Sequence, residues 1–407
     1  MLLRVVDYVA NPGGGVRFLV ELLAALSNGR DDLRIELISH GAGLARYRPL
    51  IEPRLPGVRM VKTSPRRRPC LQGRWRHRLP GATGLQARLF GAASLLRWQV
   101  SPQVFDGADV VWFPWVPWHE APPPGATHVV GTYHDAIMHQ CESIMPAALR
   151  EAAWQLEKGW FDSQARIVVS SEVTRCATAS LFGTPTRPVS IVRLSADHAA
   201  GVETGPLPAA WDWVNRPFIL CPANTTAHKN HETLLAGFAA WNAAMPLVLC
   251  GAGTDITAAV QDPRGAKLHA LAADLGLLTS GRLITLGYVS DALYYALLQR
   301  AWGVVMPTLA EGGGSFPVME AMQLGIPVIC SDIPVLREQV AFFGGRPLWF
   351  EPLAAGDLAD RLAELQLNDV REREAAQAAR SGLLRRGWNH VAADYMKIFT
   401  AAAGRGA

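Results

Sequence analysis

The segment PTLAEGGGSFPVMEAM, residues 307–322, carries the strongest structural signal in this chain. The apolar run 303–306 before it predicts a buried strand that ends at Pro307. Three successive glycines follow, and Pro317 suits the first turn of a helix because its fixed φ matches helical backbone. A strand, a glycine loop and a helix N-terminus in this order are typical of an anion site in an α/β sheet.

Two carboxylates, Glu311 and Glu320, lie on either side of this glycine loop. A carboxylate repels a phosphate, but it accepts hydrogen bonds from hydroxyl groups. The segment therefore predicts a ligand that carries both a phosphate and a polyol, as a nucleotide-sugar does.

The bulk composition indicates a large globular protein. A chain of 407 residues is too long for one ordinary core and predicts two domains. No apolar run has the length of a membrane span, and the first residues, MLLRVV, predict a strand rather than a signal peptide. The six cysteines are scattered without a CxxC pair, which is typical of reduced thiols in a cytosolic protein.

Positive charge is concentrated in residues 51–100, which hold eleven Lys or Arg against one acid, Glu52. One interpretation is a solvated loop. The other is a patch for an anionic membrane surface or for an acceptor that bears a pyrophosphate. Binding of nucleic acid is disfavoured because no stacking or groove-reading motif accompanies the charge.

Strand and helix patterns alternate twice along the chain, which predicts an α/β fold of two Rossmann-like, doubly wound parallel-sheet domains. We place the first domain at 1–195, a linker at 196–216, the second domain at 217–385 and a final helix at 386–407. The expected strands are 4–9, 33–39, 110–113, 128–132, 167–170 and 190–194, then 218–221, 247–250, 283–286, 303–306, 328–330 and 348–350.

Further candidate residues follow predicted strands, where ligands of open α/β sheets bind. Gly13, Gly14 and Gly15 follow the first strand and let backbone approach a ligand, although they do not form the GxGxxG fingerprint. His134 can exchange a hydrogen bond with a sugar hydroxyl. Lys229 can neutralise a leaving diphosphate, where Asn224 offers only a neutral hydrogen bond.

No metal or cofactor is expected. The sequence has no DxD flanked by strand signals and no His/Cys cluster at ligand spacing. A metal-free mechanism needs protein cations and helix dipoles to hold the charge of a diphosphate, and Lys229 and the two glycine loops are the candidates.

Taken together, these motifs resemble the retaining glycosyltransferases of family 4, which have the GT-B fold. The resemblance spans nearly the whole chain, and its motifs are highly specific. They are the glycines at 13–15, His134-Asp135, residues 170–172, 222–231, 287–290, 307–322, 327–338, 344–345 and 350–352.

The resemblance implies a donor site mainly in the second domain. It implies that Glu320 binds the ribose and that Glu311 orients the donor sugar with the glycine-loop amides. Lys229 would hold the diphosphate, and His134 would touch the sugar from the first domain. The remaining donor contacts are expected at Gly13, Gly14, Asn224, Gly313, Gly314, Ser315 and Phe316.

Two departures from the family pattern concern this site. Most members have an arginine five residues before the lysine, and here that position is Asn224. The two acids of the family usually enclose seven residues, whereas eight lie between Glu311 and Glu320. We expect the helix-borne Glu320 to keep its register and the extra residue to be absorbed among the glycines, with Glu311 displaced if it is not.

The leading hypothesis is a metal-independent hexosyltransferase that uses a GDP- or UDP-sugar. Its acceptor is a glycan or a lipid-linked glycan of surface polysaccharide or lipopolysaccharide assembly, and we expect a cytoplasmic protein, peripheral on the inner face of the membrane. The alternative is a degenerate GT-B protein that binds a nucleotide-sugar or glycan without transfer. A GT-B phosphorylase or epimerase is a third reading.

Overall fold

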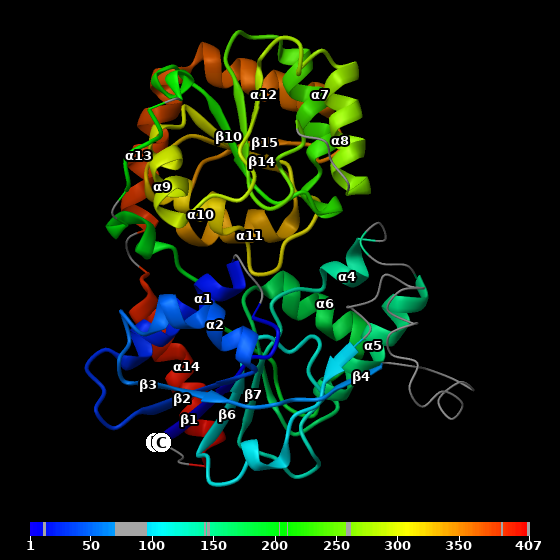
Figure 1. Cartoon of the computed structure of the whole chain (residues 1–407), viewed down its shortest axis with the longest axis vertical. Coiled ribbons are helices and arrows are strands. Elements are labelled where there is room, and N and C mark those ends of the chain that lie inside the picture. The colour runs from blue at the N-terminus through cyan, green and yellow to red at the C-terminus, as the bar shows by residue number, and fades with distance from the viewer. Residues whose placement is uncertain are drawn as a thin grey trace. The chain divides into compact units, whose positions relative to one another are not determined.

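The structure is a computed structural model. It describes residues 1–404 except 11–13, 70–95, 142, 143, 145, 146, 203, 210, 258–261, 384 and 385. The chain divides into two compact units (Figure 1). The first unit is Met1–Leu194 with Trp388–Ala407, and the second is Ser195–Gly387.

The first unit is built on a parallel seven-stranded sheet with the order β3-β2-β1-β6-β7-β8-β9. The central strands are buried and almost wholly apolar, as expected for a parallel sheet covered on both faces. In chain order the strands are β1 (Leu2–Val6), β2 (Arg34–Ser39), β3 (Val58–Lys62), β6 (Val110–Phe113), β7 (Val129–Thr132), β8 (Arg166–Val169) and β9 (Ser190–Ile191).

Six helices of this unit concern the argument: α1 (Gly14–Ser27), α2 (Gly41–Ile51), α4 (Ile137–Gln140), α5 (Ala147–Phe161), α6 (Glu172–Phe182) and α14 (Trp388–Ala402). Helix α14 packs against α1 and β7. Its Tyr395 is buried against Trp112, and the Tyr395 hydroxyl lies 3.0 Å from Thr132 Oγ1. The last helix of the chain thereby completes the core of the first unit.

The second unit is built on a parallel six-stranded sheet with the order β12-β11-β10-β13-β14-β15. The order reverses between β10 and β13, which is where a doubly wound sheet opens a ligand crevice at its carboxyl edge. The strands are β10 (Ile219–Pro222), β11 (Leu247–Cys250), β12 (Leu283–Thr285), β13 (Gly303–Met306), β14 (Val328–Ser331) and β15 (Leu348–Phe350).

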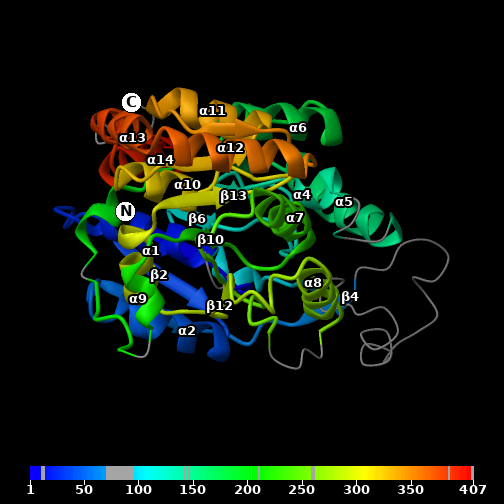
Figure 2. The same cartoon turned by 90° about the horizontal axis from the view of Figure 1, so that it is seen from above.

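Helices cover both faces of the second sheet. Helices α7 and α8 lie side by side in both views, and α12 packs on α7 (Figures 1 and 2). Helix α10 packs on β13, β14 and α13. The helices are α7 (His231–Trp241), α8 (Pro263–Asp274), α9 (Asp291–Arg300), α10 (Phe316–Gln323), α11 (Pro334–Phe343), α12 (Ala355–Leu367) and α13 (Asp369–Leu383), with 3-10 turns η4 (Asp197–Gly201), η5 (Asp212–Asn215) and η6 (Ala227–Lys229).

The expected fold class is confirmed, and most expected strands agree with the structure to within a residue or two. The first strand is shorter than expected. It ends at Val6 rather than at residue 9, because the Asp7 carboxylate accepts hydrogen bonds from the Val9 and Ala10 amides and turns the chain. The short antiparallel pair β4 (Arg67–Pro69) and β5 (Leu96–Trp98) was not predicted, nor was β3.

The segment 196–216, expected to be a linker, belongs to the second unit. Side-chain hydrogen bonds from its start to other residues of that unit explain why it is not a separate linker. The hydroxyl of Ser195 donates to the carbonyl of Arg386 at 2.7 Å, and His198 bonds to Glu320 at 3.1 Å. Among the described residues, no helix combines the length and the apolar character that crossing a membrane requires.

Candidate functional site

Two loops meet at the carboxyl edge of the second sheet. The loop after β13 bonds to the carbonyl of His228, through the Leu309 amide at 2.7 Å and the Thr308 hydroxyl at 3.1 Å. His228 belongs to η6, which follows β10. These bonds join the segment that carries Lys229 to the segment that carries Glu311.

Lys229 and Glu311 form an ion pair, with 2.5 Å between Nζ and Oε1. Both side chains are largely buried, at 15% and 9% exposure. An ammonium has three protons, so Lys229 can keep Glu311 and still donate to a phosphate oxygen. The structure thus brings together two of the residues that the sequence analysis singled out, although they are 82 positions apart.

The N-terminus of α10 lies at the end of the glycine loop. The Ser315 amide donates to Oε1 of Gln339, a residue of α11, at 3.0 Å. The Ser315 hydroxyl is buried and has no hydrogen-bond partner among the described residues. A helix N-terminus with an unpartnered hydroxyl favours binding of an anion. Phe316 begins the helix, and its ring lies 6.1 Å from that of His198.

Gly314 is required in this loop because its φ is +103°, and a Cβ there would lie 2.1 Å from Nε2 of Gln339. We expect Gly314→Ala to displace Gln339, to release the Ser315 amide and to destabilise the second unit by about 2 kcal/mol. Urea unfolding measures this loss. Gly356→Ala is the matched control, since a Cβ at Gly356 meets no atom within 4 Å. Equal stability of the two variants would contradict the role given to Gln339.

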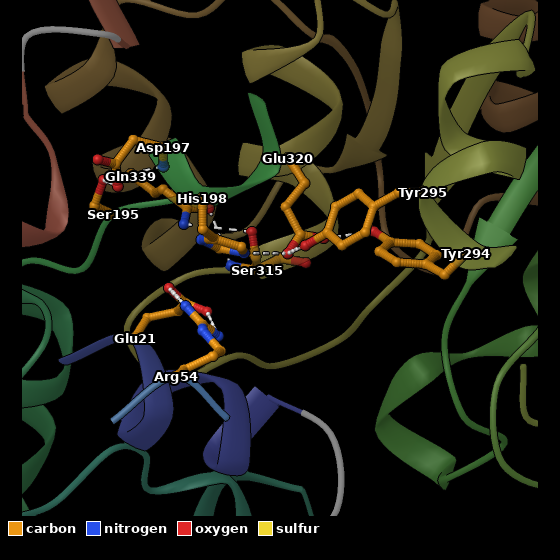
Figure 3. Close-up of polar contacts among 10 residues, drawn as sticks. All are labelled: Glu21, Arg54, Ser195, Asp197, His198, Tyr294, Tyr295, Ser315, Glu320 and Gln339. Carbon is orange, nitrogen blue, oxygen red and sulfur yellow. Dashed lines mark hydrogen bonds and ion pairs between the residues drawn. The ribbon is translucent and has the colours of Figure 1, made fainter. Parts of the chain in front are cut away.

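Glu320 is fully buried on α10, and its carboxylate accepts from three side chains (Figure 3). The Tyr294 hydroxyl donates to Oε2 at 2.5 Å, and the Tyr295 hydroxyl donates to Oε1 at 2.9 Å. Nε2 of His198 donates to Oε1 at 3.1 Å. Sequence reasoning missed these three partners. The only signal was a pair of adjacent tyrosines on α9, and His198 lies 122 positions from Glu320.

Asn224 lies exposed in the loop after β10, and its side chain is oriented locally. Its Oδ1 accepts from the amide of Thr226 at 3.1 Å and from the hydroxyl of the same residue at 2.5 Å. The Nδ2 group has no partner among the described residues and remains a donor. The loop after β11 packs on this backbone, since a Cβ on Gly251 would lie 2.6 Å from the Ala223 carbonyl oxygen.

A second cation, Arg264, lies near the loop after β10, but it is paired with Glu232. Arg264 begins α8 and donates to the Thr225 carbonyl at 2.9 Å. Its guanidinium also forms an ion pair with Glu232, and Arg264 holds the pKa of that carboxyl down at about 2 against the opposing effect of burial. Lys229 is therefore the cation that the structure places beside the loop of Glu311. Residues 203, 210 and 258–261 lie outside the described part of the chain.

His134 belongs to the first unit, in the loop after β7. Its Nε2 lies 2.8 Å from the carbonyl oxygen of Pro114 and must carry the proton, because a carbonyl only accepts. Burial lowers the pKa of His134 to about 4, so the ring is neutral at pH 7 and Nδ1 holds a lone pair. The ring stacks on Trp115 with 5.1 Å between centroids, and the Phe18 ring meets its edge at 4.6 Å.

The loop that carries His134 is anchored from both sides by one buried carboxylate. Oε2 of Glu157, on α5, accepts from the Tyr133 hydroxyl at 2.8 Å and from Nε2 of His139 at 2.9 Å. Tyr133 precedes His134 directly, and His139 follows it on the short helix α4.

Of the expected glycines, Gly14 and Gly15 open α1, whereas Gly13 lies outside the described residues.

We expect the stability of the protein to fall as the pH falls from 6.5 towards 4. Burial lowers the pKa of both His134 and His231 from 6.5 to about 4. In this window the unfolded chain binds protons that the folded chain does not, and each histidine removes about 2 kcal/mol between pH 6.5 and 5. Urea unfolding at both pH values measures the loss. His134→Asn should flatten the dependence, and stability that rises on acidification would contradict it.

The described residues contain no cluster of three or more His, Cys, Asp or Glu side chains arranged to hold a metal ion. The described residues at the carboxyl edge of the second sheet include one cation beside Glu311, Lys229, together with the Asn224 amide and the N-terminus of α10.

Residues 209–382 match the family model described as Glycosyl transferases group 1. A search of curated proteins found no match. Solved structures share the fold at low identity. Sucrose-phosphate synthase from Thermosynechococcus elongatus is 15% identical, with a TM-score of 0.68 and 100% of both chains covered.

HepE from Anabaena, in complex with UDP and glucose, is 15% identical, with a TM-score of 0.67 and 98% of this chain and 100% of that chain covered. WaaG, a glycosyltransferase involved in lipopolysaccharide biosynthesis, is 14% identical, with a TM-score of 0.64 and 98% and 99% covered. The fold is GT-B, and the second unit carries the group 1 domain. The family match thus covers most of the second unit, and the solved structures show that the whole chain has the GT-B fold.

Proposed function

We propose that this chain is a retaining, metal-independent glycosyltransferase of family 4. It moves a hexose from a nucleotide-diphosphate sugar to a glycan or lipid-linked acceptor in surface polysaccharide or lipopolysaccharide assembly. The observation that carries the proposal is the Lys229–Glu311 pair beside the glycine loop and the α10 N-terminus. A cation, a carboxylate and a helix dipole are what a phosphate joined to a sugar needs.

In the proposed reaction, Lys229 stabilises the charge that develops on the leaving diphosphate. The Ser315 hydroxyl and the α10 N-terminus share that charge, and Nδ2 of Asn224 adds a neutral hydrogen bond. Glu311 accepts from a hydroxyl of the donor sugar. The leaving phosphate takes the proton of the acceptor hydroxyl on the face that it vacates, which retains the anomeric configuration.

Glu320 is proposed to bind the ribose of the donor. Its carboxylate is completely buried and accepts from Tyr294, Tyr295 and His198. Because the carboxylate is completely buried, a ribose hydroxyl reaches it only in exchange for a neighbouring side chain that moves aside. The same three donors keep the carboxylate oriented in the absence of that exchange.

UDP-glucose is the first donor to test, because structures of HepE were solved with UDP and glucose and with UDP-glucose. GDP-sugars form the second group. The protein is incubated with each donor and with a glycan and lipid extract as acceptor, and released diphosphate is measured with and without a chelator. Release that depends on the acceptor and survives chelation supports the proposal.

Two results would count against it. Binding of a nucleotide-sugar by calorimetry without any transfer favours the degenerate binding protein. If neither binding nor transfer is seen with any donor, the proposed donor site is contradicted.

Membrane association rests on the basic stretch 51–100, of which residues 70–95 lie outside the described part. Flotation with anionic liposomes at low and high salt tests it.

A further inference from the structure

The segment that begins the second unit carries His198. The chain passes from the first unit to the second between Leu194 and Ser195, and it returns to the first unit after Gly387. The 3-10 turn η4 follows the first of these crossings directly and packs on α10, the helix of Glu320. His198 is therefore a residue of a crossing segment that reaches the proposed donor site.

The two crossing segments are fastened to each other within the second unit. The Ser195 hydroxyl donates to the carbonyl of Arg386 at 2.7 Å. Asp197 lies against Gly387, because a Cβ on that glycine would be 2.4 Å from Oδ2 of Asp197. Ser195 and Ala199 are buried, at 1% and 0% exposure. A movement of η4 therefore changes contacts at both crossings.

His198 differs from the two tyrosines that share its acceptor, Glu320 (Figure 3). Tyr294 and Tyr295 belong to the regular helix α9, and both are buried, at 7% and 2% exposure. His198 comes from a turn of five residues, and its bond of 3.1 Å to Oε1 is the longest of the three. Helical hydrogen bonds hold the backbone of the tyrosines, so His198 is the donor that can move aside at the lowest cost.

His198 also covers the face of α10 that leads to the glycine loop. Phe316 begins α10, and Glu320 lies four positions later, so the two side chains share one face of the helix. The His198 ring lies 6.1 Å from the Phe316 ring, while its Nε2 bonds to Glu320. A nucleotide that extends from the glycine loop to Glu320 along this face therefore meets the imidazole.

A ribose hydroxyl can take the place of the imidazole on Glu320. The carboxylate only accepts, and both the N–H of an imidazole and the O–H of a ribose donate. The exchange replaces one donor by another at Oε1, so the buried carboxylate keeps its hydrogen bonding. A ribose without hydroxyl groups has no proton to give and cannot make the exchange.

We propose that His198 holds the place on Glu320 that a ribose hydroxyl takes, so that a bound nucleotide displaces it and loosens η4 at the crossing between the units. The inference rests on the proposed donor site and adds two properties to it. His198 lowers the affinity for the nucleotide, and nucleotide binding is coupled to the segment that links the units. Because such coupling is reciprocal, a mutation that releases η4 favours nucleotide binding.

Amide hydrogen exchange of the full-length protein tests the displacement. A peptide of residues 195–201 contains the amides of Asp197 and Ala199, which are both hydrogen-bonded within this segment. We expect its exchange to become at least about threefold faster on saturation with UDP or GDP, because local opening is favoured. The 2′,3′-dideoxy forms of the two nucleotides should leave it unchanged. A merely structural role of His198 predicts slower exchange or no change.

Calorimetry on His198→Ala separates competition from support. If His198 competes with the ribose, the variant should bind UDP or GDP about tenfold more tightly than wild type, since one hydrogen bond to a charged group no longer has to be broken. If His198 only orients Glu320, the variant should bind more weakly. The peptide of residues 195–201 should exchange fast in this variant without nucleotide, and nucleotide should add little.

Two further variants serve as controls. His198→Gln keeps a donor of similar reach and should return the affinity to that of wild type. Trp241→Phe also loses one hydrogen bond of the second unit, from Nε1 to Gln366 at the end of α7 away from the glycine loop, and it should leave affinity and exchange unchanged. A midpoint of unfolding measured for each variant shows that it is folded.

The inference is overturned if UDP or GDP binds wild type without faster exchange in residues 195–201. It is also overturned if folded His198→Ala binds the nucleotide no more tightly than wild type, and in both cases the proposed donor site is retained. If neither nucleotide binds wild type or His198→Ala, the donor site and the inference are both contradicted. Binding to His198→Ala but not to wild type supports the inference, because His198 then blocks the site.

Discussion

Lys229→Ala is expected to lower the turnover number of sugar transfer at least about 100-fold, the effect of removing one preorganised group that stabilises developing charge. Lys229 is the cation that the structure places beside Glu311 and the glycine loop, because the nearby Arg264 is paired with Glu232. Asn224, in the loop after β10, offers only a neutral hydrogen bond and therefore does not replace this charge. Diphosphate release in single-turnover assays measures the loss.

Lys267→Ala is the matched control for this change. Lys267 is 66% exposed and pairs with Glu232, away from Glu311, so the variant should keep wild-type turnover. Lys229→Arg keeps the charge but not the compact ammonium, and it should recover part of the activity. If folded Lys229→Ala kept wild-type turnover, the proposal that the donor diphosphate binds beside Lys229 would be contradicted.

Glu320→Ala is expected to destabilise the second unit by about 4 kcal/mol, which corresponds to a fall of about 10 °C in its unfolding midpoint. The alanine leaves a cavity and removes the carboxylate that accepts from the hydroxyls of Tyr294 and Tyr295 and from Nε2 of His198. Calorimetry on the full-length protein measures the change. Binding of the nucleotide-sugar should be lost as well.

Two further variants separate stability from ribose binding. Glu374→Gln replaces an exposed carboxylate of α13 and should leave the midpoint within about 1 °C. Glu320→Gln preserves the volume but sets an amide against three donors, so it should be destabilised by less than the alanine variant. A Glu320→Ala protein as stable as wild type would show that the buried hydrogen bonds do not hold this helix in place.

Periodicity predicted most of the fold because a parallel sheet covered on both faces needs continuous apolar strands. The runs 110–113, 247–250, 303–306 and 348–350 agree with β6, β11, β13 and β15. The prediction was wrong where a side chain overrides the pattern. Asp7 ends β1 early by capping two amides, and β3 was missed because its residues are only partly buried and carry charge.

Much of the candidate site also followed from the sequence. Lys229, Glu311, Ser315 and Glu320 were singled out because each stands after a strand or at a helix start. The partners of these residues could not be predicted. Gln339, His198 and the two tyrosines lie 24 to 122 positions away from the residues that they contact, and no local pattern encodes such pairs.

By itself the sequence determined two alternating α/β halves, a glycine loop between two acids and a lysine after a strand. These are local properties, set by backbone preference and by the spacing of apolar residues. Only the tertiary structure decided that Lys229 pairs with Glu311, that Glu320 is buried under three donors, and that one of these donors, His198, belongs to a segment that crosses between the units. Each depends on segments brought together by the fold, because hydrogen bonds and ion pairs act through space rather than along the chain.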